Sequence, residues 1–423
     1  MATQYRARVT DAEMASRLRS SGAVLLEGPK ACGKTETARQ QAGSVALLDV
    51  DQALRTAAGI DPMLVLEGAT PRLLDEWQVV PEIWNAVRRQ VDDRRADGQF
   101  ILTGSATPAD DITRHTGAGR IARLRMRTMS LHETGHSSAA ISLAGLLDGT
   151  FHSCPDPRLV LDDLIELVCR GGWPAALHRS LTEAQQGVRD YLEEIRRTDI
   201  HTVDGVRRDP ARVRAVLAAL ARNVATEVSQ ATLAADAGAH LDSRTRPRTE
   251  TVSDYLTALT RLMIVEEQPA WAPHLRSRSL TRSTAKQHFV DPSLAVAALS
   301  ARPADLRADL NLFGLLFESL VVRDLRIYAQ PIGAEVRHYR DNTGLEIDAI
   351  VTAGTDRWAA FEIKLGASAA ITDRAAANLA KFADRIDTTR CGQPAALAVI
   401  VGTGYGYQRP DGVLVIPIGA LHP

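Results

Sequence analysis

Cysteine, aromatic residues and lysine are all scarce in this chain, and each scarcity excludes a class of protein. The 423 residues include four cysteines with no C-x-x-C pair, which argues against a structural zinc site and against a disulfide framework. Aromatic residues make up 4% of the chain, so a platform that stacks single-stranded nucleic acid is not expected. Lysine supplies only five of the 50 basic residues, so a lysine inside a motif is less often a coincidence.

Long apolar segments and a net charge are missing as well. No stretch approaches the roughly 18 uncharged apolar residues that suggest a membrane helix, and the N-terminus lacks the apolar core of a signal peptide. We therefore expect a cytoplasmic protein with no membrane partner. Because the formal net charge is −1, any attraction to nucleic acid must come from a local patch.

The first part of the chain alternates between two kinds of segment. Short apolar runs at residues 23–27, 45–50, 72–74 and 100–102 are separated by stretches with helical character. This alternation is typical of a sheet that is covered by helices on both faces. The first domain is therefore predicted to be α/β.

The middle of the chain changes to helical periodicity, with apolar residues at spacings of three and four from about residue 158 to 235. A polar turn at 238–250 precedes a segment that we expect to run from a helix into a strand. A basic loop at 271–288 then leads to another apolar segment. This order of helix, turn, helix and β-ribbon predicts a winged helix-turn-helix spanning about 205–295.

The last part of the chain predicts a third α/β unit. One long amphipathic helix is expected from about residue 305, followed by strands near 336–340, 346–351 and 357–363. A length of 423 residues suits two or three domains. We place three domains at 1–185, 186–300 and 301–423.

The most specific motif lies directly after the first apolar run. Residues 28–35, GPKACGKT, satisfy the phosphate-loop pattern G-x-x-x-x-G-K-S/T between a strand and a helix, which is the context that this motif requires. Its two glycines let backbone N–H groups and the helix N-terminus face phosphates. We expect ATP to be bound by the motif and the next residue, namely Gly28, Pro29, Lys30, Ala31, Cys32, Gly33, Lys34, Thr35 and Glu36.

Four residues of this region receive individual roles. Lys34 is expected to reach the β and γ phosphates, and Thr35 to offer its hydroxyl to Mg²⁺. Asp75, at the end of the strand-like run PRLLD, would hold the ion from the other side, and Glu76 would orient a water. The sequence thus predicts ATP and Mg²⁺ as cofactors and ATP hydrolysis as the reaction.

Two further residues are candidates for the same reaction. Ser105 ends another apolar strand and is suited to sensing the γ-phosphate or the attacking water, although an N-cap or a turn is the alternative. Arg120 would stabilise the transferring phosphoryl group as a finger from a neighbouring subunit, and a solvated surface arginine is the alternative. The first role of Arg120 requires a homo-oligomer.

Several runs together resemble one family. PRLLDEWQ, then FILTGSA, then AGRI followed by MSLHE, and finally GGWP are similar to prokaryotic AAA-type ATPases that carry a C-terminal domain of unknown function. The resemblance covers nearly the whole chain. It implies a P-loop AAA-type core with a helical lid, a winged-helix middle and a small α/β C-terminal domain with a restriction-endonuclease-like core. In that pattern Lys34 and Thr35 fall on the phosphate loop, Asp75 and Glu76 on the acidic strand end, and Ser105 on the sensor position.

A second group of polar residues lies in the last domain. Glu318 is expected on a helix, Asp348 on a strand, and Glu362 and Lys364 on the next strand, where a separation of two residues places both on one face. Two carboxylates can hold Mg²⁺ and a lysine can position the nucleophile, so the group would cleave phosphodiesters. The alternatives are an inactive or merely binding fold, and an exposed charged strand face without a site.

A basic run without acidic residues lies where the wing is expected. Its candidate contacts to nucleic acid are Arg276, Arg278, Arg282 and Lys286. Arg244, Arg246 and Arg248 precede the expected recognition helix at 249–262, where contacts to the DNA backbone are common. Such residues would neutralise phosphates of duplex DNA, whereas a protein-interaction module or a solvated charged face is the alternative.

The leading hypothesis is a nucleotide-driven switch whose ATP state moves the later modules on DNA or on a protein partner. Two other functions stay open. One is an ATP-dependent, Mg²⁺-requiring nuclease in genome defence or mobile-element control. The other is a non-catalytic interaction protein of a paired, toxin–antitoxin-like regulatory system.

Overall fold

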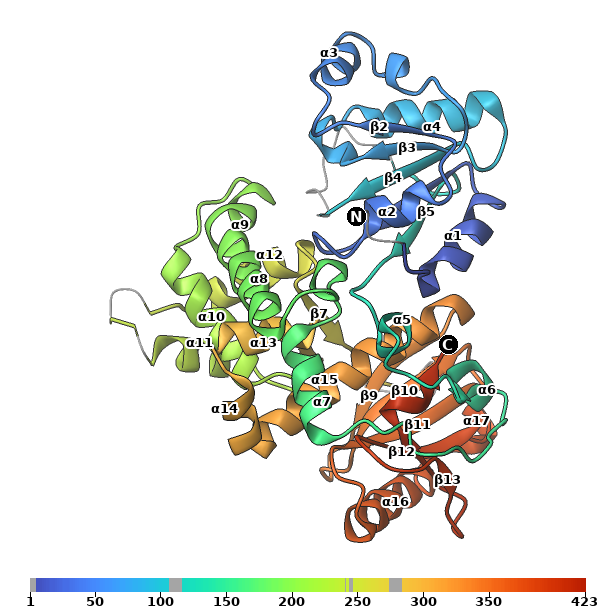
Figure 1. Ribbon diagram of the computed structural model, residues 1–423, viewed down its shortest axis with the longest axis vertical. Coiled ribbons are helices and arrows are strands. Elements are labelled where there is room, and N and C mark those ends of the chain that lie inside the picture. The colour runs from blue at the N-terminus through green and yellow to red at the C-terminus, as the bar shows by residue number, and fades with distance from the viewer. Residues whose placement is uncertain (1–4, 106–115, 240, 243–245, 274–283) are drawn as a thin grey trace. The chain divides into compact units, whose positions relative to one another are not determined.

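The computed structural model describes residues 5–105, 116–239, 241–242, 246–273 and 284–423 (Figure 1). Its internal contacts divide the chain into two compact units. The first unit comprises Met1–Thr128, Asp199–Arg207 and Ala258–Ile264, and the second comprises Met129–Thr198, Arg208–Thr257 and Val265–Pro423. The division into three domains at the boundaries given above stays a prediction.

The first unit contains a five-stranded parallel sheet in the order β2-β3-β4-β1-β5. Its strands are β1 (Ala23–Glu27), β2 (Ser44–Leu47), β3 (Arg72–Asp75), β4 (Phe100–Gly104) and β5 (Ile121–Arg125). The helical elements are α1 (Val9–Leu18), α2 (Lys34–Arg39), α3 (Gln52–Ile60), η1 (Pro62–Val65), η2 (Trp77–Val79), α4 (Ile83–Arg94) and α9 (Ile200–Thr202). The predicted α/β fold of the first part is therefore confirmed.

Alternate residues of the central strands fill two separate apolar cores. Leu25 and Leu102 belong to the core that also contains Trp77 and Trp84, whereas Leu26 and Ile101 belong to a second core. Successive side chains of a strand point to opposite faces, so a strand that is buried on both faces must be apolar throughout. This explains why the sequence shows continuous apolar runs rather than alternation.

The parallel pairing determines where the polar ends of the strands lie. β1, β3 and β4 run in the same direction, and their register pairs Glu27 with Gly104 and Leu74 with Leu102. The residues that follow these three strands therefore meet at one edge of the sheet, where ligands bind in open α/β sheets. The phosphate loop, Glu76 and Ser105 all follow strands at this edge.

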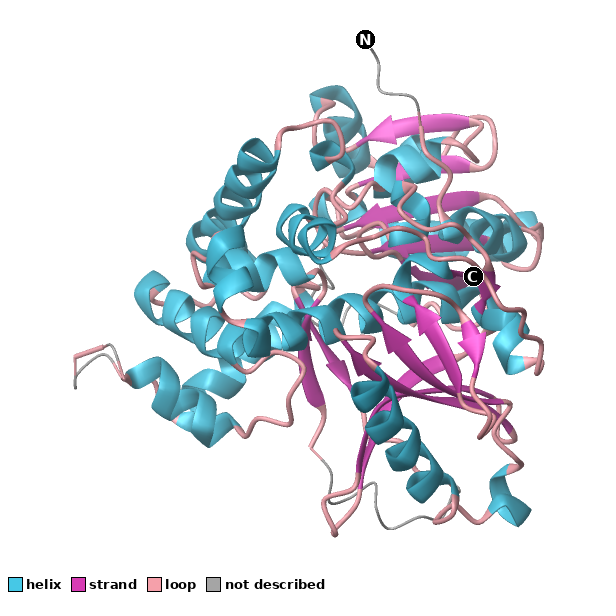
Figure 2. Cartoon of the chain, turned by 60° about the horizontal axis from the view of Figure 1, so that its bottom comes forward, coloured by secondary structure: helices cyan, strands magenta, loops and turns pink. Residues whose placement is uncertain are grey.

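The second unit combines a helical part with a mixed sheet (Figure 2). Its longer helices are α7 (Leu161–Arg170), α8 (Leu181–Glu194), α10 (Pro210–Arg222), α11 (Gln230–Gly238), α12 (Thr249–Arg261), α13 (Pro292–Ala298), α14 (Pro303–Ala308), α15 (Leu310–Ala329) and α16 (Ala369–Ala383). The last turn of α12 belongs to the first unit. The shorter elements are α5 (Leu131–Thr134), β6 (Ile141–Ser142), α6 (Leu143–Leu147), η3 (Pro174–Ala176), the π-helical turn η4 (Ile195–Asp199), η6 (Gln330–Ile332), α17 (Thr388–Cys391), η7 (Ile418–Ala420) and β15 (Leu421–His422). The last residue of η4, Asp199, belongs to the first unit.

The mixed sheet has six strands in the order β13-β14-β12-β11-β10-β9. They are β9 (Glu335–Arg340), β10 (Glu346–Ala353), β11 (Arg357–Lys364), β12 (Ala396–Val401), β13 (Tyr407–Gln408) and β14 (Leu414–Pro417). α16 packs on one face through Leu379 and Phe382, which share an apolar core with Trp358 and Ala360 of β11. α15 contacts β9, β10 and β11. The strands predicted near 336–340, 346–351 and 357–363 are confirmed.

A two-stranded antiparallel ribbon, β7 (Val265–Gln268) and β8 (Lys286–Phe289), follows α12. Helix, turn, helix and ribbon thus occur in the predicted order. The ribbon is not a free-standing hairpin, because Gln268 Nε2 donates to the backbone oxygens of Arg337 and Asp348, each at 3.0 Å. The ribbon is therefore hydrogen-bonded to the strands β9 and β10.

The long amphipathic helix predicted from residue 305 is wrong in two respects. The segment contains two helices, α14 and α15, because Asp309 caps the second one by accepting a hydrogen bond from Leu312 N at 3.0 Å. Moreover, the residues from Leu316 to the end of α15 are buried on all sides, charged residues included. Among the helices that the structure describes, none is both long and apolar enough to cross a membrane.

Candidate nucleotide site and a second carboxylate cluster

The phosphate loop joins β1 to α2, and its two motif glycines are required for different reasons. Gly33 has φ = 103° at the N-cap of α2, a left-handed conformation that favours glycine. A Cβ on Gly28 would lie 2.2 Å from the backbone oxygen of Met126, so the segment after β5 leaves no space for a side chain. The loop is thus shaped by one conformational and one steric requirement.

Lys34 is the first residue of α2 and folds back over the loop. Its side chain is buried, and its ammonium donates to the backbone oxygens of Gly28 at 3.0 Å and Pro29 at 2.9 Å. Both acceptors are uncharged, so the positive charge of Lys34 is not neutralised by them. The ammonium therefore lies inside the loop in which phosphates are expected.

The side chains of three other residues predicted to contact the nucleotide, Cys32, Glu36 and Lys30, have partners within the protein. Cys32 is buried with its Sγ directed at Met126 O, and Glu36 is exposed and pairs with Arg39 at 3.8 Å. The ammonium of Lys30 lies 2.5 Å from Asp199 Oδ1, within the same unit. Lys30 is therefore paired with a carboxylate that the sequence did not associate with the loop.

Asp75 and Thr35 meet as predicted. The Thr35 hydroxyl donates to Asp75 Oδ1 at 2.9 Å, and the hydroxyl of Thr103 on β4 donates to the same oxygen. Adjacent hydroxyl and carboxylate oxygens are the hard ligands that Mg²⁺ prefers, so Thr35 and Asp75 fit the ion that the motif implies. Thr103 fixes the carboxylate from the other side.

Glu76 and Ser105 are also brought together. Glu76 has φ = 51°, and its N–H donates to Thr103 Oγ1 at 3.3 Å. Its carboxylate accepts from Ser105 Oγ at 3.3 Å and from the amide of Gln78. A non-glycine residue in the left-handed region is uncommon and costs free energy, and such residues gather at functional sites. The strained turn places the Glu76 carboxylate next to the predicted sensor.

Two residues at this edge of the sheet, Thr103 and Gln78, were not predicted from the sequence as site residues. Thr103 contacts both acidic residues, and Gln78 contacts Glu76. Thr103 lies on β4 two residues before Ser105, which directly follows the strand, so the period of two along the strand is a signal that could have identified it. Gln78 follows Glu76 in a 3₁₀ turn, and the sequence carries no comparable signal for it.

Arg120 lies at the opposite edge of the sheet. Its backbone oxygen accepts from Ala23 N, at the start of β1, and its guanidinium pairs with Asp92 at 2.6 Å. Because the phosphate loop follows the other end of β1, Arg120 cannot contact the loop of its own chain. A catalytic role for Arg120 therefore requires a second subunit.

The four residues of the predicted nuclease-like site lie close together in the second unit. Lys364 Nζ lies 2.8 Å from Asp348 Oδ2 and 2.6 Å from Glu362 Oε2. The pairing of Ala349 with Phe361 in the hairpin of β10 and β11 brings Asp348 beside Glu362, as the spacing predicts. Glu318, on α15, is reached through Lys286, whose ammonium lies 2.8 Å from Glu318 Oε1 and 3.8 Å from Asp348 Oδ1.

Burial and charge shift the pKa values of this cluster in different directions. Burial raises the pKa of Glu318 to about 8, and burial together with the neighbouring Asp348 raises the pKa of Glu362 to about 7. Burial also acts to raise the pKa of Asp348, but the charges of Lys364 and Lys286 outweigh it and lower this pKa. Despite their burial, the surrounding carboxylates raise the pKa of both lysines. The lysines therefore stay charged, and Asp348 is their most firmly ionised partner.

The position of Lys286 corrects its assignment as a nucleic-acid contact. The sequence places it in a solvated wing, whereas its side chain is 2% exposed and surrounded by carboxylates. A buried ammonium that is already paired cannot serve as a surface contact for phosphates. Arg276, Arg278, Arg282 and Arg244 lie outside the described residues.

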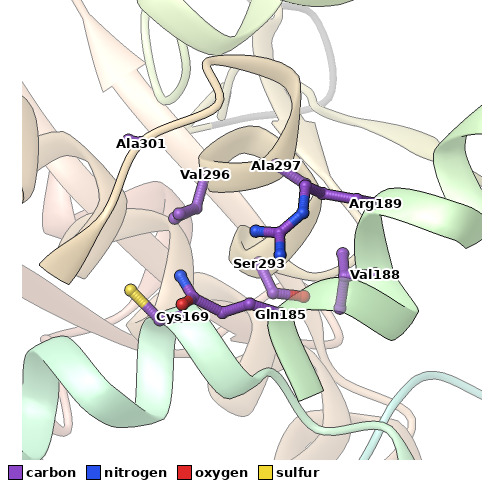
Figure 3. A pocket seen from close by; sticks show the side chains of 8 residues that line it. All are labelled: Cys169, Gln185, Val188, Arg189, Ser293, Val296, Ala297 and Ala301. Carbon is purple, nitrogen blue, oxygen red and sulfur yellow. The ribbon is translucent and has the colours of Figure 1, made fainter. Parts of the chain in front are cut away.

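The described part of the chain also contains a pocket between α7, α8 and α13 (Figure 3). Its lining residues are Cys169, Gln185, Val188, Arg189, Ser293, Val296, Ala297 and Ala301. Burial raises the pKa of the Cys169 thiol to about 12, so the thiol stays protonated and is not a nucleophile. Ser293 donates to Asp291 and accepts from the Trp173 indole at 3.0 Å, which makes it part of the packing between segments.

Comparisons with known families match three parts of the chain. Residues 20–135 match a family model described as an AAA domain. Residues 161–305 and 313–421 match two models described as domains of unknown function, DUF8612 and DUF4143. The prediction of an AAA-type region with a phosphate loop is thereby confirmed for residues 20–135.

Individual relatives extend the similarity along the chain. Two uncharacterized proteins, one from Mycobacterium bovis and one from Mycobacterium tuberculosis, are each 24% identical over 411 residues, which is 96% of this chain and 82% of the relative. Among solved structures, the chain is similar to a Walker-type ATPase of Pyrococcus abyssi with a TM-score of 0.39 and 12% sequence identity, covering 68% of this chain and 94% of that chain. The sequence similarity to the mycobacterial relatives thus extends well beyond the AAA region.

Proposed function

We propose that the protein binds ATP with Mg²⁺ at the edge formed by β1, β3 and β4, and that it hydrolyses the nucleotide. The observation that carries this proposal is the 2.9 Å contact between the hydroxyl of Thr35 and Asp75, which joins the phosphate loop to the acidic end of β3. The match of residues 20–135 to an AAA domain supports the same function.

Each residue of this edge has a role in the proposed reaction. Lys34 exchanges its backbone acceptors for the β and γ phosphates, while Thr35 and Asp75 hold Mg²⁺. The ion, when bound, neutralises charge that develops on the phosphates. Glu76 orients the attacking water, and Ser105 holds the Glu76 carboxylate in place.

The ATPase proposal is tested by phosphate release from the full chain with and without Mg²⁺. Lys34→Ala should lose ATP binding and hydrolysis, because it removes the ammonium that lies on the backbone oxygens of Gly28 and Pro29 inside the loop. Lys381→Ala, at an exposed lysine of α16, is the matched control and should retain activity. Hydrolysis that survives Lys34→Ala would refute the assigned site.

We further propose that the nucleotide state acts as a switch on duplex DNA or on a protein partner in the cytoplasm. Support comes from the helices and the ribbon in winged-helix order, and from the basic residues between β7 and β8. ATPase rates with duplex DNA, with RNA and with neither distinguish the partners. Charge reversal of Arg276, Arg278 and Arg282 should weaken DNA binding and its salt dependence; if neither changes, a protein partner sought by pull-down replaces DNA.

The proposed role of Arg120 in hydrolysis requires that the protein forms a homo-oligomer. Its place at the opposite edge of the sheet permits a finger in trans only. If Arg120 acts in this way, mixing Arg120→Ala chains with Glu76→Gln chains should restore part of the hydrolysis that each variant lacks. No restoration, or a monomer in sedimentation, would leave Arg120 as a surface arginine paired with Asp92.

A second candidate function is phosphodiester cleavage by the last domain. One observation favours it: the ammonium of Lys364 lies within 2.8 Å of a carboxylate oxygen of both Asp348 and Glu362. Mg²⁺-dependent cleavage of DNA or RNA that is lost in Asp348→Ala and Lys364→Ala would support it. Absence of cleavage on all substrates would leave the domain as a binding fold.

A further inference from the structure

Lys286 occupies an unusual place for a residue of a basic run. It is the first residue of β8, and its ammonium lies 2.8 Å from Glu318 Oε1, 2.8 Å from Glu346 Oε1 and 3.8 Å from Asp348 Oδ1. A buried charge is costly unless it is paired, and here one ammonium is surrounded by carboxylates from a helix and a strand. Lys286 is thus the central cation of this cluster.

The second lysine completes the neutralisation. Lys364 pairs with Asp348 and Glu362, so each of the four carboxylates lies within 2.8 Å of an ammonium. The amide of Asn378 and the N–H of Ile363 donate further hydrogen bonds, to Glu362 Oε1 at 2.6 Å and to Asp348 Oδ2 at 2.8 Å. At least one oxygen of each of the four carboxylates is therefore already engaged by a cationic or N–H donor.

This arrangement does not fit the Mg²⁺ that a restriction-endonuclease-like core implies. Mg²⁺ requires near-octahedral coordination by oxygen, with carboxylates free to approach it. Within the described ranges, no group of three or more His, Cys, Asp or Glu residues could hold a metal ion. An ammonium, by contrast, is a compact point charge with three donors, and it satisfies three carboxylates without that geometry.

Lys286 is delivered by a different element from those that carry the carboxylates. Glu318 lies on α15, and Glu346 and Asp348 lie on β10, whereas Lys286 belongs to the ribbon and pairs with Gln268 at the end where the connecting segment joins the two strands. Glu346 is 38% exposed, so the cluster borders on solvent. If Lys286 were absent from the cluster, a cation from solvent could therefore reach the carboxylates.

We propose that Lys286 is a built-in cation that takes the place of a divalent metal, so that the cluster of Glu318, Glu346 and Asp348 binds no Mg²⁺ or Mn²⁺ in the native fold. This inference is independent of ATP hydrolysis. It bears on the second candidate function, because a metal-dependent reaction at this cluster then requires Lys286 to leave it.

The test is a titration of the nucleotide-free full chain with MnCl₂, followed by calorimetry and by thermal unfolding. The wild type and Lys286→Arg should show no Mn²⁺ binding that depends on Asp348. Lys286→Ala should gain one equivalent of bound Mn²⁺, and its affinity for the ion should exceed that of the wild type by on the order of tenfold or more. Adding Asp348→Asn to Lys286→Ala should abolish the gain, which assigns the bound ion to this cluster and not to the nucleotide site.

Two further outcomes keep the test decisive if Lys286→Ala folds poorly. Mn²⁺ should then restore its folding, whereas NaCl of equal ionic strength should not, because screening does not replace a bound cation. Failure of Mn²⁺ to bind or to rescue Lys286→Ala overturns the proposal. It is also overturned if the wild type binds Mn²⁺ and loses that binding in Asp348→Asn.

Discussion

The nucleotide edge of the first unit and the carboxylate cluster of the second unit use the same residue types for opposite purposes. At the nucleotide edge, the ammonium of Lys34 rests on two backbone oxygens, and Asp75 accepts from two hydroxyl groups. In the cluster, Lys286 and Lys364 are paired directly with carboxylates. Charge is kept available for a ligand in the first case and is neutralised internally in the second.

The comparison explains why a motif of charged residues is a poor guide to chemistry on its own. A lysine held by neutral acceptors can exchange them for phosphate at small cost. A lysine buried among carboxylates leaves uncompensated charges behind if it moves. The partners of a charged side chain, and not its presence, decide whether it is available for a ligand.

The largest expected effect concerns the stability of the carboxylate cluster. Asp348→Asn should lower the free energy of unfolding of the second unit by about 1.5–3 kcal/mol, because the buried carboxylate of Asp348 accepts from Lys364 and from the N–H of Ile363. Urea unfolding followed by circular dichroism measures this change. Asp373→Asn, which removes an exposed ion pair to Arg409, is the control and should cost at most about 1 kcal/mol. Equal effects of the two variants would contradict the comparison.

A smaller effect is expected on the pH dependence of stability. The pKa of Glu318 is about 8 in the folded chain and lies near 4.3 in an unfolded one, so the folded state binds more protons between these values. The contribution of Glu318 to the free energy of unfolding should therefore be complete below about pH 4.3 and should be lost as the pH rises toward 8, by on the order of 1 kcal/mol per pH unit. Glu318→Gln should flatten this slope, whereas Glu335→Gln, at an exposed position of β9, should not.

The smallest expected effect concerns Ser105, which is proposed to position Glu76 and not to contact the nucleotide. Ser105→Ala removes a single hydrogen bond to Glu76, so kcat should fall about fivefold, the equivalent of about 1 kcal/mol, while KM for ATP stays the same. Steady-state kinetics with Ser20→Ala as the control measures this split. A change in KM without a change in kcat would mean that Ser105 binds the nucleotide and does not position Glu76.

The sequence signals for the phosphate loop and for the acidic end of β3 are local, so their proximity at one edge of the sheet could be predicted. The phosphate loop, its flanking strand and helix, and the acidic end of β3 are each readable within a few residues. Thr103 was missed because its role depends on the register of β3 and β4, which aligns Leu74 with Leu102 and so brings Thr103 beside Asp75. That register is a tertiary property.

The second unit was predicted less well for the same reason. Asp348, Glu362 and Lys364 could be placed because they share one hairpin. Lys286 could not, since a lysine in a basic run reads as solvated until the ribbon is known to pack on β9 and β10. The break at Asp309 was overlooked because the apolar spacing continues through it.

The central claim is that Lys34 binds the nucleotide while Glu76 acts in its hydrolysis, and ATP binding and turnover measured together on one variant test it most directly. Glu76→Gln should bind ATP with the affinity of the wild type and turn it over at least about 100-fold more slowly, because a neutral amide orients and polarises the attacking water less well than a carboxylate. Turnover at the wild-type rate in Glu76→Gln, or loss of ATP binding, would contradict the account.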